Sequence, residues 1–158
     1  MSDFSRQNGK RWEDYILAEC EELARLGEAF VSKNWEAPPV PGQHVKREAS
    51  KPDFSGFTRR GRHIVFEAKA TRSTTALPMS SIAAHQWEYL DDACYHGAMS
   101  FVYVLDGLER KWVFPWLDVL EWREVRASIP FIEGRPCQKR DGETWLDVLL
   151  RLEAPGVS

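Results

Sequence analysis

Apolar residues near the start of the chain recur at steps of three and four positions. The residues that follow this period are Trp12, Tyr15, Ile16, Cys20, Leu23 and Leu26. Such a period places side chains along one face of a helix, where they can be buried together. Gly27 follows directly, and glycine commonly ends a helix because it adopts a left-handed conformation without strain. The pattern predicts a first helix over residues 5–26.

Shorter runs in the middle of the chain have the length and composition of strands. They cover residues 28–35, 53–58 and 62–70. The last two runs are separated only by residues 59–61, which are two arginines and a glycine, and this spacing favours a hairpin. Because strand side chains alternate between the two faces of a sheet, Glu67 and Lys69 must point to the same side.

The second half of the chain continues with alternating helices and strands. We expect a polar loop at 72–76, a helix over 78–95 that begins near Ser80 or Ser81, strands over 98–105 and 111–114, and a short helix over 116–122. Gly97 is placed to end the second helix. Residues 144–152 fit either a helix or a strand. The order αβββαβ with a tail predicts an α/β fold with a mixed central sheet flanked by helices.

A chain of 158 residues, with 43% hydrophobic and 28% charged residues, has the size and composition of one globular domain. We therefore expect a single domain over residues 1–158. The longest apolar stretch, 98–105, is much shorter than a membrane span, and the first residues lack the pattern of a signal peptide. Three scattered cysteines argue against a disulfide framework and a zinc site. These features predict a cytoplasmic protein that does not bind membranes.

The formal net charge of −3 conceals an uneven distribution of charge. Residues 44–72 hold eight basic and three acidic residues, so this segment carries +5 and the rest of the chain carries −8. The basic residues are Lys46, Arg47, Lys51, Arg59, Arg60, Arg62, Lys69 and Arg72. Lysine and arginine bind nucleic acids by neutralising phosphates, so the segment favours a DNA partner. A solvated charged surface is the alternative interpretation.

Within this segment, Pro52 and Asp53 are followed by Glu67, Ala68 and Lys69, a spacing that matches the PD-(D/E)XK pattern of nucleases. Phosphodiester hydrolysis needs a hard divalent cation, Mg²⁺ or else Mn²⁺, held by oxygen ligands. We expect Asp53, Glu67 and the carbonyl of Ala68 to hold the cation. Lys69 is expected to position water or to stabilise negative charge on the phosphate. An ordinary Glu/Lys pair on a surface hairpin is the alternative.

The sequence around this pattern resembles the RecU-type Holliday-junction resolvases. The resemblance rests on Asp53-Phe54-Ser55-Gly56, Ile64-Val65-Phe66-Glu67-Ala68-Lys69-Ala70-Thr71, Leu77-Pro78 and His85-Gln86, which occur in that family's order. It implies the restriction-endonuclease-like fold and a metal-dependent endonuclease that cleaves four-way DNA junctions in recombination and repair. It also implies a homodimer, with recombination proteins as further partners.

The resemblance also assigns roles to residues outside the central pattern. The first helix of the family carries a glutamate that reaches the metal, and Glu13 corresponds to it, so Glu13 is an expected ligand. Gln86 resembles a glutamine that is directed towards the active site, which makes it a candidate catalytic residue. A solvent-facing helical glutamate and a hydrogen-bonded core glutamine are the alternative interpretations.

Contacts with DNA are expected on both sides of the catalytic strand. Arg72 and Thr74 follow that strand directly, where polar donors suit a DNA phosphate. The predicted DNA-binding residues are Lys46, Arg47, Arg59, Arg60, Arg62, Arg72 and Thr74. The resemblance places the family's junction-entering stalk at residues 36–51, which are otherwise a surface loop.

One position departs from the family. Pro52 stands where resolvases of this type commonly have threonine, and this departure weakens the expectation of junction specificity. A nuclease of the same type that acts on other DNA in repair, restriction or phage biology is therefore an alternative. A non-catalytic DNA-binding relative is a further alternative.

Overall fold

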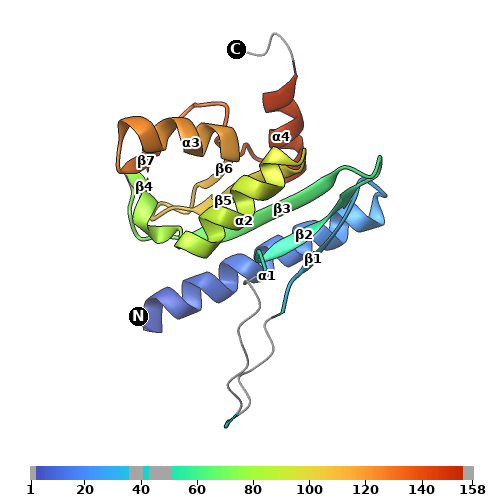
Figure 1. The fold of residues 1–158 in the computed structure, drawn as a ribbon, viewed down its shortest axis with the longest axis horizontal. Coiled ribbons are helices and arrows are strands. Elements are labelled where there is room, and N and C mark those ends of the chain that lie inside the picture. Colours follow the sequence, from blue (N-terminus) through green and yellow to red (C-terminus); the bar gives the residue numbers. More distant parts are fainter. Residues whose placement is uncertain (1–2, 36–40, 43–50, 155–158) are drawn as a thin grey trace.

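A five-stranded mixed sheet forms the centre of the molecule (Figure 1). The computed structural model describes residues 3–35, 41–42 and 51–154. In order across the sheet, the strands are β1 (Ala29–Lys33), β2 (Phe54–Thr58), β3 (His63–Ala70), β5 (Met99–Leu105) and β6 (Lys111–Pro115). β3 and β5 are parallel neighbours, and the other neighbouring strands of this sheet are antiparallel.

Helices cover both faces of this sheet. α1 (Asp3–Arg25) and α4 (Trp145–Glu153) pack on one face, whereas α2 (Ala84–Tyr95) and α3 (Trp116–Val125) pack on the other. Each pair of helices closes its own hydrophobic core against the sheet. α2 provides the crossover that joins two parallel strands. The predicted mixed sheet flanked by helices, in the order αβββαβ, is confirmed.

The central strands are buried on both faces, which explains their apolar sequence. In β3, Ile64 and Phe66 face the core under α1, whereas Val65 faces the core under α2. The ring of Phe66 stacks on Phe54 of β2 and on Phe101 of β5, with ring centroids 4.9 and 4.4 Å apart. This aromatic column joins three strands and stabilises the register of the β2–β3 hairpin.

The segment after β3 differs from the prediction of a helix over 78–95 that begins near Ser80 or Ser81. In its place are β4 (Ala76–Pro78), the 3₁₀ turn η1 (Met79–Ser81) and α2, which begins at Ala84. β4 pairs with the unpredicted strand β7 (Ser128–Pro130), and Leu77 lies opposite the buried Ile129. Strands of three residues carry no periodicity, so this pairing of distant segments leaves no local sequence pattern.

Residues 144–152, which fit either a helix or a strand, form most of α4. Thr144 caps this helix: its hydroxyl accepts a hydrogen bond from the backbone N–H of Asp147, and the Asp147 carboxylate accepts one from the backbone N–H of Thr144. The buried face of the helix consists of Trp145, Leu146, Val148 and Leu149. The cap and this apolar face together favour the helix.

The other predicted elements are confirmed, with ends that shift by three residues or fewer. Gly27 ends α1 as expected, with a φ of +70°. Among the described helices, none combines the length and the hydropathy needed to cross a membrane. Residues 36–40 and 43–50 lie outside the described residues, and most of the expected stalk therefore does as well.

β1 and β2 approach so closely at Gly56 that no side chain fits there. Gly56 pairs with Val31 across the two strands. A Cβ atom at this position would lie 1.9 Å from the carbonyl oxygen of Phe30 and 2.7 Å from the Cα of Val31. Both neighbouring atoms belong to the backbone, so they cannot rotate away. The hairpin therefore needs glycine at position 56.

Gly56→Ala is expected to lower the free energy of unfolding by about 3 kcal/mol, because the strands must separate to accommodate the methyl group. Gly9→Ala in α1 is the matched control, since nothing lies within 4 Å of its added Cβ. Alanine also favours a helix over glycine, so the free energy of unfolding of this control should be unchanged or higher by about 0.5–1 kcal/mol. Urea denaturation measures both variants, and a fully stable Gly56→Ala protein would contradict the close approach.

Candidate active site

Asp53 and Glu67 meet where β2 begins and β3 continues beyond it. The β2–β3 pairing ends at Phe54 opposite Phe66, which brings the next residues, Asp53 and Glu67, to the same edge. The backbone N–H of Ala68 has no β2 residue opposite it and donates instead to Oδ2 of Asp53 at 3.0 Å. The hairpin register therefore positions both acidic residues, as the sequence pattern predicts.

The carboxyl group of Glu67 is enclosed by the protein, and only 2% of the residue is exposed. Burial raises the pKa of Glu67 to about 9; its hydrogen bond with Asp53 and the negative charge of Asp53 act in the same direction, and Lys69 opposes them. Two carboxylates this close repel each other when both are ionised. A bound cation would relieve that repulsion.

Gln86 connects the two ends of the Glu-x-Lys pattern. Its Nε2 donates to Oε2 of Glu67 at 3.1 Å, and its Oε1 accepts a hydrogen bond from Nζ of Lys69 at 2.9 Å. The same Oε1 accepts from the backbone N–H of Ala83 at 3.0 Å, which anchors the side chain to the start of α2. Glu67 and Lys69 therefore share one face, as predicted, and Gln86 lies among the residues of the site.

The oxygen atoms at this edge fit a hard divalent cation. Carboxylate oxygens are the ligands that Mg²⁺ prefers, and Mg²⁺ in nucleic-acid enzymes is commonly held by one or two carboxylates together with water and phosphate. Asp53 and Glu67 supply two such groups. Among the described residues, no three Asp, Glu, His or Cys side chains gather closely enough to hold a metal by themselves. The carbonyl of Ala68 as a third ligand stays a prediction.

Glu13 lies near this edge but makes a different contact. Its carboxylate forms an ion pair with the ammonium group of Lys33. Lys33 pairs with Phe54, the residue that follows Asp53. Glu13 is thus held next to the β1–β2 edge by a cation of the protein itself. A role for Glu13 as a metal ligand stays a prediction, and it would require the carboxylate to leave Lys33.

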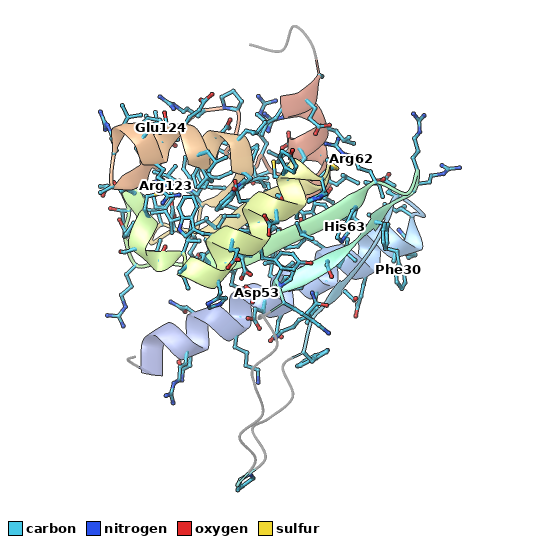
Figure 2. The ribbon with its side chains drawn as sticks, in the orientation of Figure 1. Phe30, Asp53, Arg62, His63, Arg123 and Glu124 are labelled. Carbon is cyan, nitrogen blue, oxygen red and sulfur yellow. The ribbon has the colours of Figure 1, made fainter. Side chains whose placement is uncertain are left out.

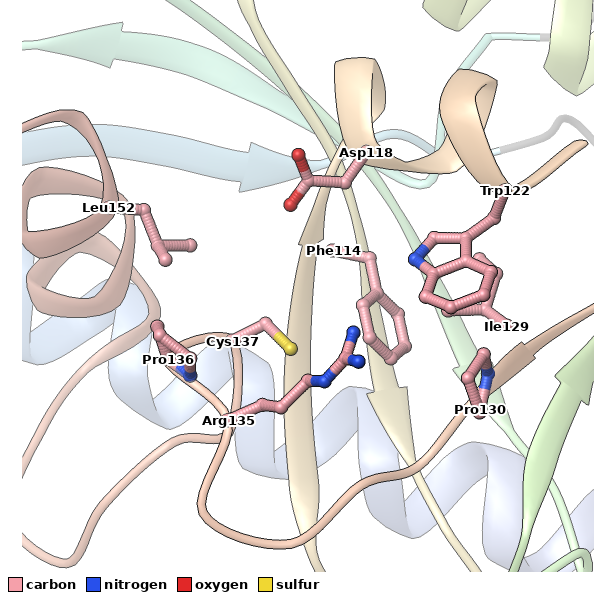
Figure 3. A pocket seen from close by; sticks show the side chains of 9 residues that line it. All are labelled: Phe114, Asp118, Trp122, Ile129, Pro130, Arg135, Pro136, Cys137 and Leu152. Atoms are coloured by element: carbon pink, nitrogen blue, oxygen red, sulfur yellow. The ribbon is translucent and has the colours of Figure 1, made fainter. Parts of the chain in front are cut away.

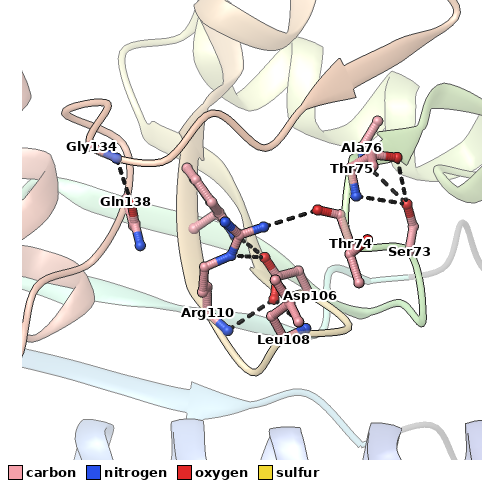
Figure 4. Close-up of polar contacts among 10 residues, drawn as sticks. Ser73, Thr74, Thr75, Ala76, Asp106, Leu108, Arg110, Gly134 and Gln138 are labelled. Atoms are coloured by element: carbon pink, nitrogen blue, oxygen red, sulfur yellow. Dashed lines mark hydrogen bonds and ion pairs between the residues drawn. The ribbon is translucent and has the colours of Figure 1, made fainter.

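The loop that carries Arg72 and Thr74 is fastened to the turn between β5 and β6 (Figure 4). The N–H of Gly107 donates to the carbonyl of Ser73 at 2.9 Å, and Nη2 of Arg110 donates to the carbonyl of Thr74 at 2.9 Å. Gly107 is required there, because a Cβ would lie 2.1 Å from the carbonyl oxygen of Arg72. The loop directly after Lys69 is therefore held in a defined position.

Asp106 holds this turn together from the inside. Its buried carboxylate accepts hydrogen bonds from the backbone N–H groups of Leu108 and Arg110, from Nε of Arg110 and from Nε1 of Trp112. Burial raises the pKa of Asp106, but the hydrogen bonds from Trp112, Arg110 and Leu108 outweigh it, and the pKa lies below the ordinary value. Asp106 therefore stays ionised and fixes Arg110 against the loop.

The predicted DNA-binding residues fall into separate places. Arg72 and Thr74 follow the end of β3 that carries Lys69. Arg59 and Arg60 lie in the β2–β3 turn at the opposite end of the hairpin, and Figure 2 shows Arg62 well away from Asp53. Five residues of extended strand, about 17 Å, separate positions 62 and 67.

The side chain of Arg62 is already engaged. Its Nη1 atom contacts both carboxylate oxygens of Glu153 at 2.9 Å, and Glu153 belongs to α4. Lys46 and Arg47 lie outside the described residues. DNA binding by these residues, and by Arg59 and Arg60, stays a prediction. Those basic residues of the run that the structure describes do not form one surface around the acidic pair.

A surface cavity of about 170 Å³ lies beside α3 (Figure 3). Trp122, Asp118, Arg135 and Cys137 are among its lining residues, and none of the residues around Glu67 belongs to it. Small-molecule sites are usually enclosed cavities lined by apolar side chains. The acidic pair lies instead where β2 begins beside β3, outside this cavity, a position that suits a substrate extending beyond the protein.

Sequence reasoning missed Lys33, Asp106 and Arg110 as residues that organise this edge. Asp106 and Gly107 have the composition of a turn, and the sequence marks them as one. Nothing local indicates that the Asp106 carboxylate is buried or that Arg110 reaches the carbonyl of Thr74. Lys33 has no motif of its own, and only the register of β1 reveals its position.

A mixed sheet with an aspartate and a Glu-x-Lys pair meeting at one edge is the arrangement of the PD-(D/E)XK class. Residues 42–133 match the family described as Recombination protein U, RecU. This match covers more than half of the chain, and the chain belongs to the RecU family.

Curated relatives agree with this assignment. A Holliday junction resolvase RecU from Geobacillus kaustophilus is 40% identical over 109 residues, which are 59% of this chain and 52% of the relative. A Holliday junction resolvase RecU from Streptococcus thermophilus is 31% identical over 140 residues, covering 78% of this chain and 68% of the relative. The chain spans only 38–52% of the length of three of the curated relatives it matches.

A solved structure of Hjc, a Holliday junction resolvase from Archaeoglobus fulgidus, is also similar. It has 19% sequence identity and a TM-score of 0.48, and the match covers 79% of this chain and 88% of that chain.

The raised pKa of Glu67 predicts how stability depends on pH in the metal-free protein. Between the ordinary value of 4.5 and about 9, the folded state keeps a proton that the unfolded chain has lost. Stability from this proton is therefore complete below 4.5 and is lost as the pH rises towards 9. Glu67→Gln should flatten this decline.

Urea denaturation in a chelator at several pH values between about 5 and 9 measures the effect. Glu88→Gln, at an exposed position of α2, is the matched control and should keep the wild-type decline. If Glu67→Gln shows the same decline of stability with pH, the prediction of a protonated Glu67 is wrong.

Proposed function

We propose that this protein is a metal-dependent DNA endonuclease that cleaves four-way DNA junctions. The observation that carries the proposal is the hydrogen-bonded cluster of Asp53, Glu67, Lys69 and Gln86 at one end of the sheet. Membership of the RecU family, whose curated relatives are named Holliday junction resolvases, supports the choice of substrate. The basic Arg72, three residues after Lys69 in the chain, supports a phosphate ligand.

Each residue of the cluster has a separate task in this proposal. Asp53 and Glu67 hold Mg²⁺, which supplies the charge that polarises a phosphate oxygen and lowers the pKa of an attacking water. Lys69, on the same face as Glu67, directs its ammonium group to the water or to the negative charge that develops on the phosphate. Gln86 orients both the Glu67 carboxylate and the Lys69 ammonium through its amide.

We further propose that the active protein is a homodimer. Resolution of a four-way junction requires cuts in two opposed strands, and two copies related by a two-fold axis supply two identical active sites. In this proposal each copy contributes one active site, formed by Asp53 and Glu67, and each active site makes one cut. Sedimentation or light scattering of the free protein and of its junction complex measures the number of copies.

Cleavage of three matched DNA substrates tests the substrate. A four-way junction, a flap and a linear duplex with the same arm sequences are incubated with Mg²⁺, with Mn²⁺ and with a chelator. We expect cleavage of the junction in both metals and none in the chelator. Preferential cutting of flap or linear duplex would favour a nuclease that acts on other DNA, and binding without cutting would favour a non-catalytic relative.

Asp53→Asn, Glu67→Gln and Lys69→Ala are each expected to reduce the cleavage rate by at least about a thousandfold, because each removes a charge used in the transition state. Junction affinity should change by less than about threefold, since the binding contacts come from other residues. Glu88→Gln is the control and should cut normally. Near-normal turnover in any of the three variants would place the active site elsewhere.

The segment proposed to select junctions begins and ends beside the active site. The N–H of Asn34 donates to the carbonyl of Asp53 at 2.8 Å, and Nδ2 of Asn34 donates to the carbonyl of Pro52 at 2.8 Å. The chain therefore leaves β1 and returns to β2 at the same edge that holds Asp53. This attachment supports a role of residues 36–51 in contacting the substrate close to the cleaved bond.

Replacing residues 38–50 by a short Gly-Ser turn is expected to remove the preference for four-way junctions over linear duplex. Catalysis at Asp53 and Glu67 should survive, because the hydrogen bonds of Asn34 and the β1–β2 pairing are retained. The ratio of the two cleavage rates measures the effect. An unchanged ratio would show that junction preference comes from another part of the protein.

A further inference from the structure

Two lysines from distant parts of the chain gather around one tyrosine of α1. Lys111, at the start of β6, has its Nζ 4.8 Å from the centre of the Tyr15 ring. Lys139 has its Nζ 5.7 Å from the same centre and donates to the Tyr15 hydroxyl at 3.1 Å. We refer to Tyr15, Lys111 and Lys139 as the lysine pair site. Cation–π contacts stabilise each ammonium group over the ring.

The backbone fixes this arrangement before any ligand binds. The N–H of Lys139 donates to the carbonyl of Lys111 at 2.8 Å, and the adjacent residues Trp112 and Gln138 form a β-bridge. The Tyr15 ring stacks on Trp12, with centroids 5.4 Å apart. The two ammonium groups are therefore held together by rigid elements, although like charges repel each other.

Among the residues that the structure describes, neither lysine forms an ion pair within 4.0 Å. The carboxylate that interacts with both lysines is Glu19 of α1. Glu19 already accepts hydrogen bonds from the Tyr103 hydroxyl at 2.6 Å and from the N–H of Trp145 at 3.2 Å. Burial raises the pKa of Glu19, and both lysines lower it. Two half-buried cations thus face one half-buried acid, so the positive charge of this group is not balanced by Glu19 alone.

The lysine pair site lies at the same end of the sheet as the active site. Lys111 pairs with Leu105, and Leu105 pairs with Ala70, the neighbour of Lys69. Two strand spacings, about 10 Å, separate β3 from β6. Lys111 approaches α1, whereas Lys69 contacts Gln86 of α2. The two sites therefore lie on opposite faces of the sheet at this end, and a duplex that contacts both has to pass across the ends of the strands.

We propose that Lys111 and Lys139, positioned by Tyr15, contact the phosphates of a DNA duplex arm next to the strand that is cleaved. The chemistry recognised is the phosphodiester backbone, because ammonium groups neutralise phosphates without reading bases. Tyr15 and Lys139 lie outside the residues that match the family, so membership of the family does not supply this contact.

This inference rests on the proposed function, and the experiment separates the two. Binding of a four-way junction and of a linear duplex is measured from about 50 to about 200 mM salt in the inactive Glu67→Gln background. The variants compared are Lys111→Gln with Lys139→Gln, the charge-keeping Lys111→Arg with Lys139→Arg, and Arg59→Gln with Arg60→Gln. The last pair removes equal charge at the hairpin turn, which is the competing DNA surface predicted from the sequence.

Each lost phosphate contact lowers the slope of log affinity against log salt by about 0.9, so the double glutamine variant should lose about 2 units on both DNA substrates. The double arginine variant is the control and should keep the wild-type slope. The Arg59/Arg60 variant should lose less than the double glutamine variant. If the double glutamine variant does not fold, the single glutamine variants should each lose about 0.9. Removing the lysines also leaves the nearby Glu19 without its counter-charges, which can lower the stability of the fold. Thermal unfolding of every variant shows whether a lower slope comes from such a loss of stability.

Two outcomes overturn the inference while the proposed function stands. The first is a wild-type slope in a folded double glutamine variant, which would make the lysines only counter-charges of Glu19. The second is an equal or larger loss in the Arg59/Arg60 variant, which would place the DNA at the hairpin turn. Failure of the Glu67→Gln protein to bind any DNA, with no cleavage by the wild-type protein, would overturn the proposed function as well.

Discussion

The contact between two carboxyl groups, Asp53 and Glu67, is the constraint on which the end of the sheet depends. Burying the ionised carboxylate of Glu67 is costly, and the half-buried carboxylate of Asp53 beside it adds repulsion. The structure lowers this cost with donors: the N–H of Ala68 for Asp53, and the amide of Gln86 for Glu67. The remaining negative charge is what a cation can satisfy. The repulsion between the two carboxylates therefore weakens the metal-free fold and at the same time favours binding of Mg²⁺.

These donors come from elements whose positions are set by distant packing. Gln86 reaches Glu67 because α2 is held against β3 and β5, and its amide also bonds the N–H of Ala83 at the start of that helix. On the other side of Lys69, the buried Asp106 holds Arg110 against the loop that carries Thr74. The core under α2 and one buried carboxylate thus determine where the polar groups around the site lie. Mutations in either place are expected to act on catalysis through position.

Much of this arrangement could be predicted from sequence because it depends on short-range geometry. The same face for Glu67 and Lys69 follows from strand alternation, and the meeting of Asp53 with Glu67 follows from a hairpin around residues 59–61. The pairing of β4 with β7 and the burial of Asp106 could not be predicted, since they depend on segments far apart in the chain. The role of Gln86 required a family resemblance, because one glutamine on a helix has no pattern of its own.

The distribution of charge shows how proximity in sequence differs from proximity in space. The basic run between residues 44 and 72 is continuous in the chain, but the β2–β3 hairpin carries Arg59 and Arg60 to one end and Lys69 to the other. Meanwhile β6 and the segment before α4 bring Lys111 and Lys139 to the end that holds Lys69. Phosphate binding depends on the spacing of cations in space. A DNA surface on this protein is therefore better sought among residues that share one end of the sheet than among neighbours in the sequence.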